Sequence, residues 1–217
     1  MVVLSSLGIV ANTLSVLIYT HPGMRSSINI LLTGLSISDG ILCILGGLVF
    51  SVPGFWAYTG APIVLNVIAY LTVYFYPLAL TAQTASIWTL MVITAERFIA
   101  VTWPLRAKDW LTLRRAYFAM ILTVAVSVAY NLVRFFEFRL VTEFPTFPTD
   151  AVEPYNNKSL NVTYNDVQSG VDAAVSAVVY YEQVLRANAT YNLIYCHWMY
   201  LIMLFIVPFV TLVVMNG

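Results

Sequence analysis

The stretch TAERFIAVTWPL, residues 94–105, closes a long apolar run and contains the charged pair Glu96-Arg97. Pro104 and Leu105 follow the arginine, and a basic patch comes directly after them. An exposed ion pair at a helix end stabilises little, and adjacent helix residues do not face one another well. The pattern leaves two interpretations open: a surface ion pair, or a switch that releases Arg97 to a partner at the end of the helix.

The composition around this stretch is that of a membrane protein. Hydrophobic residues make up 60% of the chain and charged residues 9%, and the mean hydropathy is +0.84. Soluble domains carry roughly 45–50% apolar and about 25% charged residues. A soluble fold of this composition would lack the polar atoms to cover its surface, whereas a bilayer removes that need. The net charge is zero, so bulk electrostatics favours no nucleic-acid partner.

Five apolar runs are long enough to cross a bilayer, which takes about 20 residues in a helix. They are continuous and not alternating, which favours helices over strands, and helices satisfy their own backbone hydrogen bonds in lipid. The expected spans are roughly 2–20, 28–52, 62–97, 113–136 and 192–216. Pro53-Gly54 should close the second span, and residues 137–190 should form a long extracellular loop. The sequence therefore predicts an all-α membrane protein.

Charged residues predict how these spans are oriented. Basic residues mark the cytoplasmic connections of membrane proteins. Here they occupy the first and third connections, as Arg25, Arg106, Lys108, Arg114 and Arg115. Sequons are glycosylated only on the lumenal side, and the long loop carries them at Asn157, Asn161 and Asn188. Both signals predict a multi-pass plasma-membrane glycoprotein with an extracellular N-terminus.

Three polar side chains fall inside the expected spans. Asp39 lies near the middle of the second span, Asn12 in the first, and Ser86 about three turns before Arg97. Ionisable groups in a bilayer are costly and suggest function. A carboxylate with hydroxyl and amide oxygens suits sodium, the one cofactor the sequence suggests. The alternative is a water-filled polar core that joins the helices by hydrogen bonds, and the residues alone do not decide between them.

Cysteine and histidine provide no catalytic or metal-binding pattern. Cys43 and Cys196 lie inside apolar runs, without the spacing of a disulfide framework or a metal site. His21 and His197 are expected at opposite faces of the membrane, so they cannot share one centre. The sequence therefore predicts a protein that is not an enzyme and that binds no metal other than sodium.

Taken together, these motifs resemble the rhodopsin-like (class A) G-protein-coupled receptors. Glu96-Arg97-Phe98 matches the family's Asp-Arg-Tyr signature. Further matches, in order and at family spacing, are Gly8, Asn12, Asn29, Leu35, Asp39, Pro104 and the span-five proline Pro208. The resemblance implies a seven-helix bundle, here represented by about five helices. It also implies that Arg97 contacts a heterotrimeric G protein, that Leu105 enters a pocket of its α subunit, and that Asp39 and Ser86 bind sodium.

Three longer strings resemble invertebrate FMRFamide-type neuropeptide receptors: YPLALTAQTASIWTL, ERFIAVTWPLRAK and YNLVRFFEF. Ala79 stands where amine receptors place an aspartate, so a cationic amine would lack its counter-ion. The resemblance therefore implies an extracellular peptide ligand. The candidate pocket residues are Tyr76, Ala79, Gln83, His197 and the outer part of the fifth span.

The chain also departs from the family pattern. Thr72 stands where the family has a cysteine bonded to the long loop, and the loop has no cysteine before Cys196, so we expect a loosely tethered loop. Thr123 replaces the usual span-four tryptophan. The span-six and span-seven motifs are not in this sequence, which suggests a partial receptor. The alternatives are a truncated, non-signalling isoform that dimerises with the full-length receptor, and a transporter or channel subunit, although we see no inverted repeats.

Overall fold

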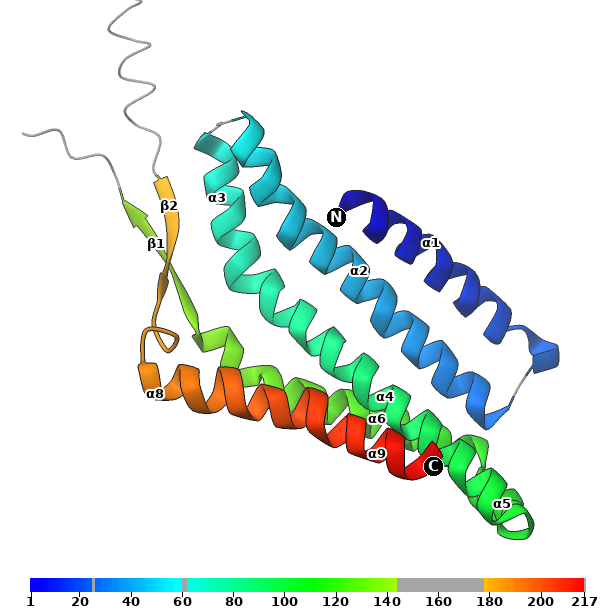
Figure 1. Cartoon of the computed structure of the whole chain (residues 1–217). Coiled ribbons are helices and arrows are strands. Elements are labelled where there is room, and N and C mark those ends of the chain that lie inside the picture. Colours follow the sequence, from blue (N-terminus) through cyan, green and yellow to red (C-terminus); the bar gives the residue numbers. More distant parts are fainter. Residues whose placement is uncertain (25, 60–61, 144–177, 217) are drawn as a thin grey trace, which may run out of the picture.

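The computed structural model describes residues 1–24, 26–59, 62–143 and 178–216 (Figure 1). The elements of the first half are α1 Val2–Tyr19, the 3-10 turn η1 Pro22–Met24, α2 Ser27–Thr59, α3 Pro62–Tyr70, the π-helix η2 Leu71–Phe75, α4 Tyr76–Thr102 and α5 Pro104–Trp110. Those of the second half are α6 Leu113–Asn131, the 3-10 helix η3 Leu132–Phe136, strands β1 Phe138–Glu143 and β2 Val178–Gln183, α8 Ala189–Tyr191, the π-helices η5 Asn192–Met199 and η6 Ile202–Ile206, and α9 Val207–Asn216.

Five helices in the described part of the chain are long and apolar enough to cross a membrane. They cover Val2–Tyr19, Ser27–Phe55, Val64–Thr102, Leu113–Phe136 and Ala189–Met215. The third joins α3, η2 and α4 into one continuous rod, and the fifth joins α8, η5, η6 and α9 (Figure 1). The predicted all-α bundle of about five membrane helices is therefore confirmed.

Helices α2 and α4 form the centre of the bundle. α1 packs on α2, α6 packs on both α2 and α4, and α9 packs on α4. One end of the bundle holds the N-terminus, the start of α3, the β-hairpin and α8 (Figure 1). The opposite end holds η1, the end of α4 and α5 (Figure 1). The bundle therefore has two chemically distinct ends, one built around a hairpin and one around the short helix α5.

Small residues set the close contacts between helices. A Cβ added at Gly8 would lie 2.5 Å from Cys43 Sγ, and one added at Gly34 would lie 2.5 Å from Met120 Sδ. Lipid tails are as apolar as the helix side chains, so no hydrophobic effect drives helices together in a bilayer. Helices associate there through van der Waals contacts, which become closer where small residues let the backbones approach. Gly8 therefore allows α1 to approach α2, and Gly34 allows α6 to approach α2.

Two of the π-helical segments, η2 and η6, lie just before a proline. Pro77 and Pro208 are buried and lie directly after η2 and η6, respectively. A proline cannot donate to the carbonyl four residues earlier, and a π turn shifts the hydrogen-bond pattern locally. The chain therefore passes both prolines without leaving the helix. Pro53 also lies within a continuous helix, but without a π turn, since α2 continues to Thr59.

Two predicted boundaries were wrong. The second span does not end at Pro53-Gly54, because lipid cannot hydrate free backbone groups and the helix is retained on both sides of the proline. The region 137–190 is not only loop, because β1 and β2 pair antiparallel from Phe138↔Gln183 to Glu143↔Val178. Aromatic and β-branched residues in both segments favour this pairing.

The tight contact at Gly34 gives a test of the packing. Gly46 lies in the same helix, and a Cβ added there would meet nothing within 4 Å. Both Gly→Ala changes gain helix propensity, but only Gly34→Ala forces Met120 to move, an overpacking cost of about 1–3 kcal/mol. We expect Gly34→Ala to lower the thermal stability of the purified chain in lipid nanodiscs, and Gly46→Ala to preserve or raise it. Equal stabilities for the two variants would contradict the packing.

Candidate functional site

Asp39 and Ser86 meet between α2 and α4. Ser86 Oγ donates a hydrogen bond to Asp39 Oδ1 at 2.5 Å, and both residues are half-buried. Asn12 instead donates from Nδ2 to the carbonyl of Gly8 in its own helix, at 2.9 Å. It nevertheless lies at the same level, since a Cβ on Gly40, the residue after Asp39, would be 3.8 Å from Asn12 Cβ. The structure therefore brings the predicted acid and hydroxyl together, with the amide beside them.

The oxygens around Asp39 fit a hard cation such as sodium, because hard cations take carboxylate and hydroxyl oxygens as ligands. The described residues contain no cluster of three or more His, Cys, Asp or Glu side chains that could hold a metal. A sodium site here would therefore be built from one carboxylate and neutral oxygens. Asp39 and Ser86 are the side chains that would hold it.

Glu96 does not hold Arg97 by an ion pair. Its Oε1 accepts a hydrogen bond of 2.7 Å from Ser27 Oγ at the start of α2, and Arg97 is exposed. Among the residues described, the recorded ion pair is Arg134–Glu137. Adjacent helix positions point in different directions. Glu96 therefore contacts Ser27 of the neighbouring helix and not Arg97, the next residue in its own helix. Arg97 is left accessible at the α5 end of the bundle.

The residues after Arg97 extend this accessible end. Phe98 packs edge-on against Trp103, with ring centroids 6.1 Å apart. Pro104 occupies the first position of α5, where its missing N–H costs nothing. Leu105 follows with 90% of its surface exposed. The α5 end of the bundle therefore presents an exposed cation and an exposed leucine.

The opposite end holds a buried ion pair that the sequence reading did not single out. Arg134 Nη1 lies 3.1 Å from Glu137 Oε1, with the two side chains 3% and 0% exposed. The same oxygen accepts a hydrogen bond of 2.8 Å from the Tyr191 hydroxyl, and Cys196 Sγ lies 3.7 Å away. Two opposite charges three residues apart at the end of an apolar run were the signal that could have identified this pair.

Aromatic rings surround the arginine of this pair. The Arg134 guanidinium lies 5.3 Å from the ring centroid of Tyr195 and 5.6 Å from that of Tyr200. The Tyr195 hydroxyl donates to the carbonyl of Tyr130, and the Tyr200 hydroxyl donates to Gln83 Oε1 at 3.2 Å. These contacts join the fourth and fifth spans to α4. They also place the predicted pocket residue Gln83 at the edge of the cluster.

Tyr76, another predicted pocket residue, belongs to a second aromatic group at the same end. Its ring lies edge-on to Phe138 of β1 at 6.3 Å, and Phe138 lies edge-on to Tyr181 of β2 at 5.4 Å. The Arg186 guanidinium lies 6.0 Å from the Tyr76 centroid and 5.7 Å from that of Phe138. Burial lowers the pKa of Arg186, but Tyr76, Glu137 and Cys196 together raise it by more, so the pKa lies above its ordinary value. Arg186 is therefore held as a cation.

The other two predicted pocket residues are placed differently. Ala79 is buried in α4, between the levels of Tyr76 and Gln83. His197 is exposed, and its Nδ1 lies 2.7 Å from the carbonyl oxygen of Asn192 in the same helix. It lines a shallow hollow formed by residues of the fifth span alone. The structure thus groups Tyr76, Ala79 and Gln83 on one helix and leaves His197 apart from them.

The hairpin is fixed without a disulfide. Both cysteines are free, yet Asn66 Oδ1 of α3 accepts a hydrogen bond of 2.9 Å from the backbone N–H of Val179 in β2. Together with the rings around Phe138, this contact corrects the expectation of a loosely tethered loop for its described part. Of the predicted glycosylation sites, Asn188 caps α8 by accepting from the N–H groups of Thr190 and Tyr191. Asn157 and Asn161 lie outside the described residues.

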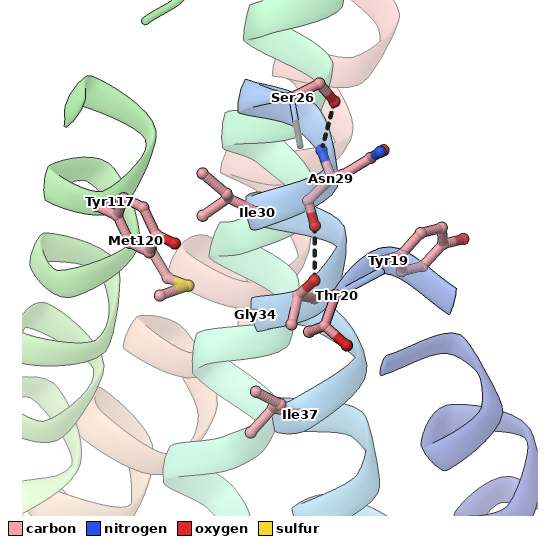
Figure 2. Close-up of a pocket in the computed structure, with 10 residues that line it drawn as sticks. Tyr19, Thr20, Ser26, Asn29, Ile30, Gly34, Ile37, Tyr117 and Met120 are labelled. Carbon is pink, nitrogen blue, oxygen red and sulfur yellow. Dashed lines mark hydrogen bonds between the residues drawn. The ribbon is translucent and has the colours of Figure 1, made fainter. Parts of the chain in front are cut away.

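A further pocket, of about 220 Å³, opens between α2 and α6 near η1 (Figure 2). Figure 2 shows Tyr117 and Met120 projecting from α6 on one side of α2, with the Asn29 side chain and Tyr19 on the other. The Asn29 backbone N–H donates to Ser26 Oγ at 3.3 Å, and Thr33 Oγ1 donates to the Asn29 carbonyl at 2.7 Å. These polar groups are satisfied within α2, so they stabilise the start of that helix.

The buried ion pair can be tested by removing one or both charges. Arg134→Met leaves the Glu137 carboxylate buried and uncompensated, which costs about 3–5 kcal/mol. The double variant Arg134→Met/Glu137→Leu should cost less than the sum of the two single changes, measured as unfolding free energies in nanodiscs. Arg139→Met, on an exposed strand position of the same hairpin, serves as the control and should change stability by under about 0.5 kcal/mol. Additive single and double effects would show that the pair is not coupled.

The chain as a whole is similar to known receptors. It matches the family described as serpentine type 7TM GPCR chemoreceptor Srw over residues 1–216. It is 37% identical over 212 residues to the FMRFamide receptor of Drosophila melanogaster, which is 97% of this chain and 34% of that protein. It is 36% identical over 135 residues to the FMRFamide peptide receptor frpr-18 of Caenorhabditis elegans, which is 62% of this chain and 31% of that protein. This chain spans about a third of the length of these curated relatives. With its membrane-length helices and a match over nearly every residue, the chain belongs to the serpentine 7TM G-protein-coupled receptor family Srw.

Proposed function

We propose that this chain belongs to a rhodopsin-like receptor that binds an extracellular FMRFamide-like neuropeptide and activates a heterotrimeric G protein. The observation that carries the proposal is the similarity to the Drosophila FMRFamide receptor over 97% of the chain. The two ends of the bundle supply matching chemistry: aromatic and charged side chains around the hairpin at one end, and the exposed Arg97 and Leu105 at the other.

The hairpin end suits a peptide better than a small amine. Ala79 offers no carboxylate to an ammonium group on α4, while Tyr76 and Gln83 lie on either side of it in the sequence. The name FMRFamide spells a peptide that ends in Arg-Phe-amide. Its guanidinium and phenyl groups match aromatic surroundings, and its amide is complementary to hydrogen-bonding side chains such as Gln83.

The α5 end suits a partner protein on the cytoplasmic side. Arg97 and Leu105 are exposed there, and the nearby residues Arg106, Lys108, Arg114 and Arg115 are basic. Basic residues near short loops favour the cytoplasmic side. The N-terminus and the hairpin lie at the opposite end (Figure 1). This arrangement supports an extracellular N-terminus in the plasma membrane.

Substitution of Arg97 tests the signalling role. In cells that express the complete receptor containing this chain, Arg97→Ala should abolish the second-messenger response to an amidated Arg-Phe peptide and leave surface expression unchanged. Arg97 is exposed and its loss removes no buried contact, so folding should be spared. Arg114→Ala, an exposed arginine at the start of α6, is the matched control and should retain most of the response. A normal response from Arg97→Ala would refute its assigned role.

Substitution of Asp39 tests the sodium site. We propose that sodium binds at Asp39 and Ser86, so agonist affinity in the unmodified receptor should change between sodium and an equal concentration of choline. Asp39→Asn removes the charge while keeping the shape, and this sodium dependence should then vanish. Ser6→Ala, which removes an exposed hydroxyl bonded within α1, should preserve it. If agonist affinity in the unmodified receptor is the same in sodium and in choline, the sodium proposal is wrong.

A further inference from the structure

The position of Arg186 suggests a more specific role for the aromatic group at the hairpin end. Its guanidinium lies near two rings that come from different elements, Tyr76 of α4 and Phe138 of β1. Tyr181 of β2 packs edge-on against Phe138 and extends the aromatic wall. We call Tyr76, Phe138 and Tyr181 the ring cluster. Because its residues come from the helix bundle and from both strands, the ring cluster exists only when the hairpin is docked.

A carboxylate near the ring cluster favours a cation, although one of its two oxygens is already paired with Arg134. Glu137 lies next to Phe138 in the chain, is fully buried, and has a carboxylate oxygen, Oε2, with no recorded hydrogen-bond partner. Its electrostatic influence reaches Arg186 and raises the pKa of that guanidinium. A cation over aromatic rings gains about 0.5–2 kcal/mol, with arginine preferred because its flat group stacks on a ring. The ring cluster therefore has the chemistry of a guanidinium site.

The guanidinium now in that site is held by the Tyr76 phenol and the two rings, without a recorded salt bridge in the described residues. Arg186 lies in the short connection between β2, which ends at Gln183, and α8, which begins at Ala189. Its side chain is half-buried and, within the described residues, is part of no ion pair. Its backbone is held separately, since the Arg186 carbonyl accepts a hydrogen bond from Asn192 Nδ2 at 2.8 Å. The side chain can therefore move into solvent while the backbone stays in place.

We propose that the ring cluster is the subsite for the arginine side chain of the peptide ligand, and that Arg186 fills it until the ligand displaces it. The inference rests on the proposed peptide-receptor function. Exchange of one guanidinium for another keeps the net charge beside Glu137 unchanged, so it avoids the cost of adding a buried charge. The released Arg186 side chain also regains rotamer freedom. Arg186 thus competes with the ligand for the ring cluster. A ligand needs a guanidinium of its own to replace that of Arg186, so the site selects for arginine.

A binding test that needs no peptide uses L-argininamide and L-citrullinamide, which have nearly the same shape but differ in charge. We expect argininamide to raise the thermal unfolding temperature of purified Arg186→Gln in nanodiscs, citrullinamide to have no effect, and the unmodified chain to respond weakly. Arg139→Gln, an exposed arginine of the same hairpin, should behave like the unmodified chain. Equal responses to the two amides, or equal responses of the unmodified chain and Arg186→Gln, would overturn the proposal. If Arg186→Gln fails to fold, Arg186→Met, which keeps an unbranched side chain without the charge, replaces it with the same expected order.

A second test uses the complete receptor and an amidated Arg-Phe peptide with arginine or citrulline. Arg186→Gln should tighten binding of the arginine peptide by about two- to thirtyfold, the range set by a cation–π contact, and leave the citrulline peptide unchanged. If both peptides bind equally to every variant, the receptor function stands and the subsite is wrong. If argininamide binds to the ring cluster but neither peptide binds, the subsite stands and the proposed function is wrong.

Discussion

The need to pair every backbone N–H and C=O group inside lipid shapes the whole molecule. A free peptide group in hydrocarbon costs several kcal/mol, so the chain stays helical even where proline removes a donor. The π turns before Pro77 and Pro208 and the unbroken helix around Pro53 follow from this constraint. Because the helices remain intact, their side chains keep a fixed angular order, and contacts such as Asp39–Ser86 between α2 and α4 become geometrically determined.

Close packing between these helices depends on glycine residues, which have no side chain to keep the helices apart. Lipid gives no hydrophobic reason for two helices to associate, so close approach at Gly8 and Gly34 has to supply dispersion contacts instead. Polar contacts then fix the ends. Glu96 joins Ser27 at one end, and Arg134 joins Glu137 at the other. Further polar contacts lie in the interior, at Asp39–Ser86 and in the buried hydrogen bond from Asn131 Nδ2 to Thr84 Oγ1.

The helical fold could be predicted from the sequence because apolar length and continuity suffice for a membrane helix. The meeting of Asp39 and Ser86 was foreseeable, since both are polar and lie deep within neighbouring spans. The Arg134–Glu137 pair was missed because it lies where an apolar run becomes polar, and a charge there is usually solvated. The partner of Glu96 could not be found by proximity in sequence, because Ser27 is remote along the chain and becomes a neighbour only when α2 and α4 pack. The β-hairpin was hidden for the same reason, as β1 and β2 are far apart in sequence.

The anchoring of the hairpin by Asn66 and by aromatic rings has a consequence for biosynthesis. The two cysteines of this chain are free, and the described hairpin is held by hydrogen bonds and ring contacts alone. Docking of the described hairpin onto this chain therefore needs no disulfide between Cys43 and Cys196. A membrane protein stabilised in this way can be produced in reducing, cell-free synthesis mixtures, where a receptor with an essential loop disulfide would be left unfinished.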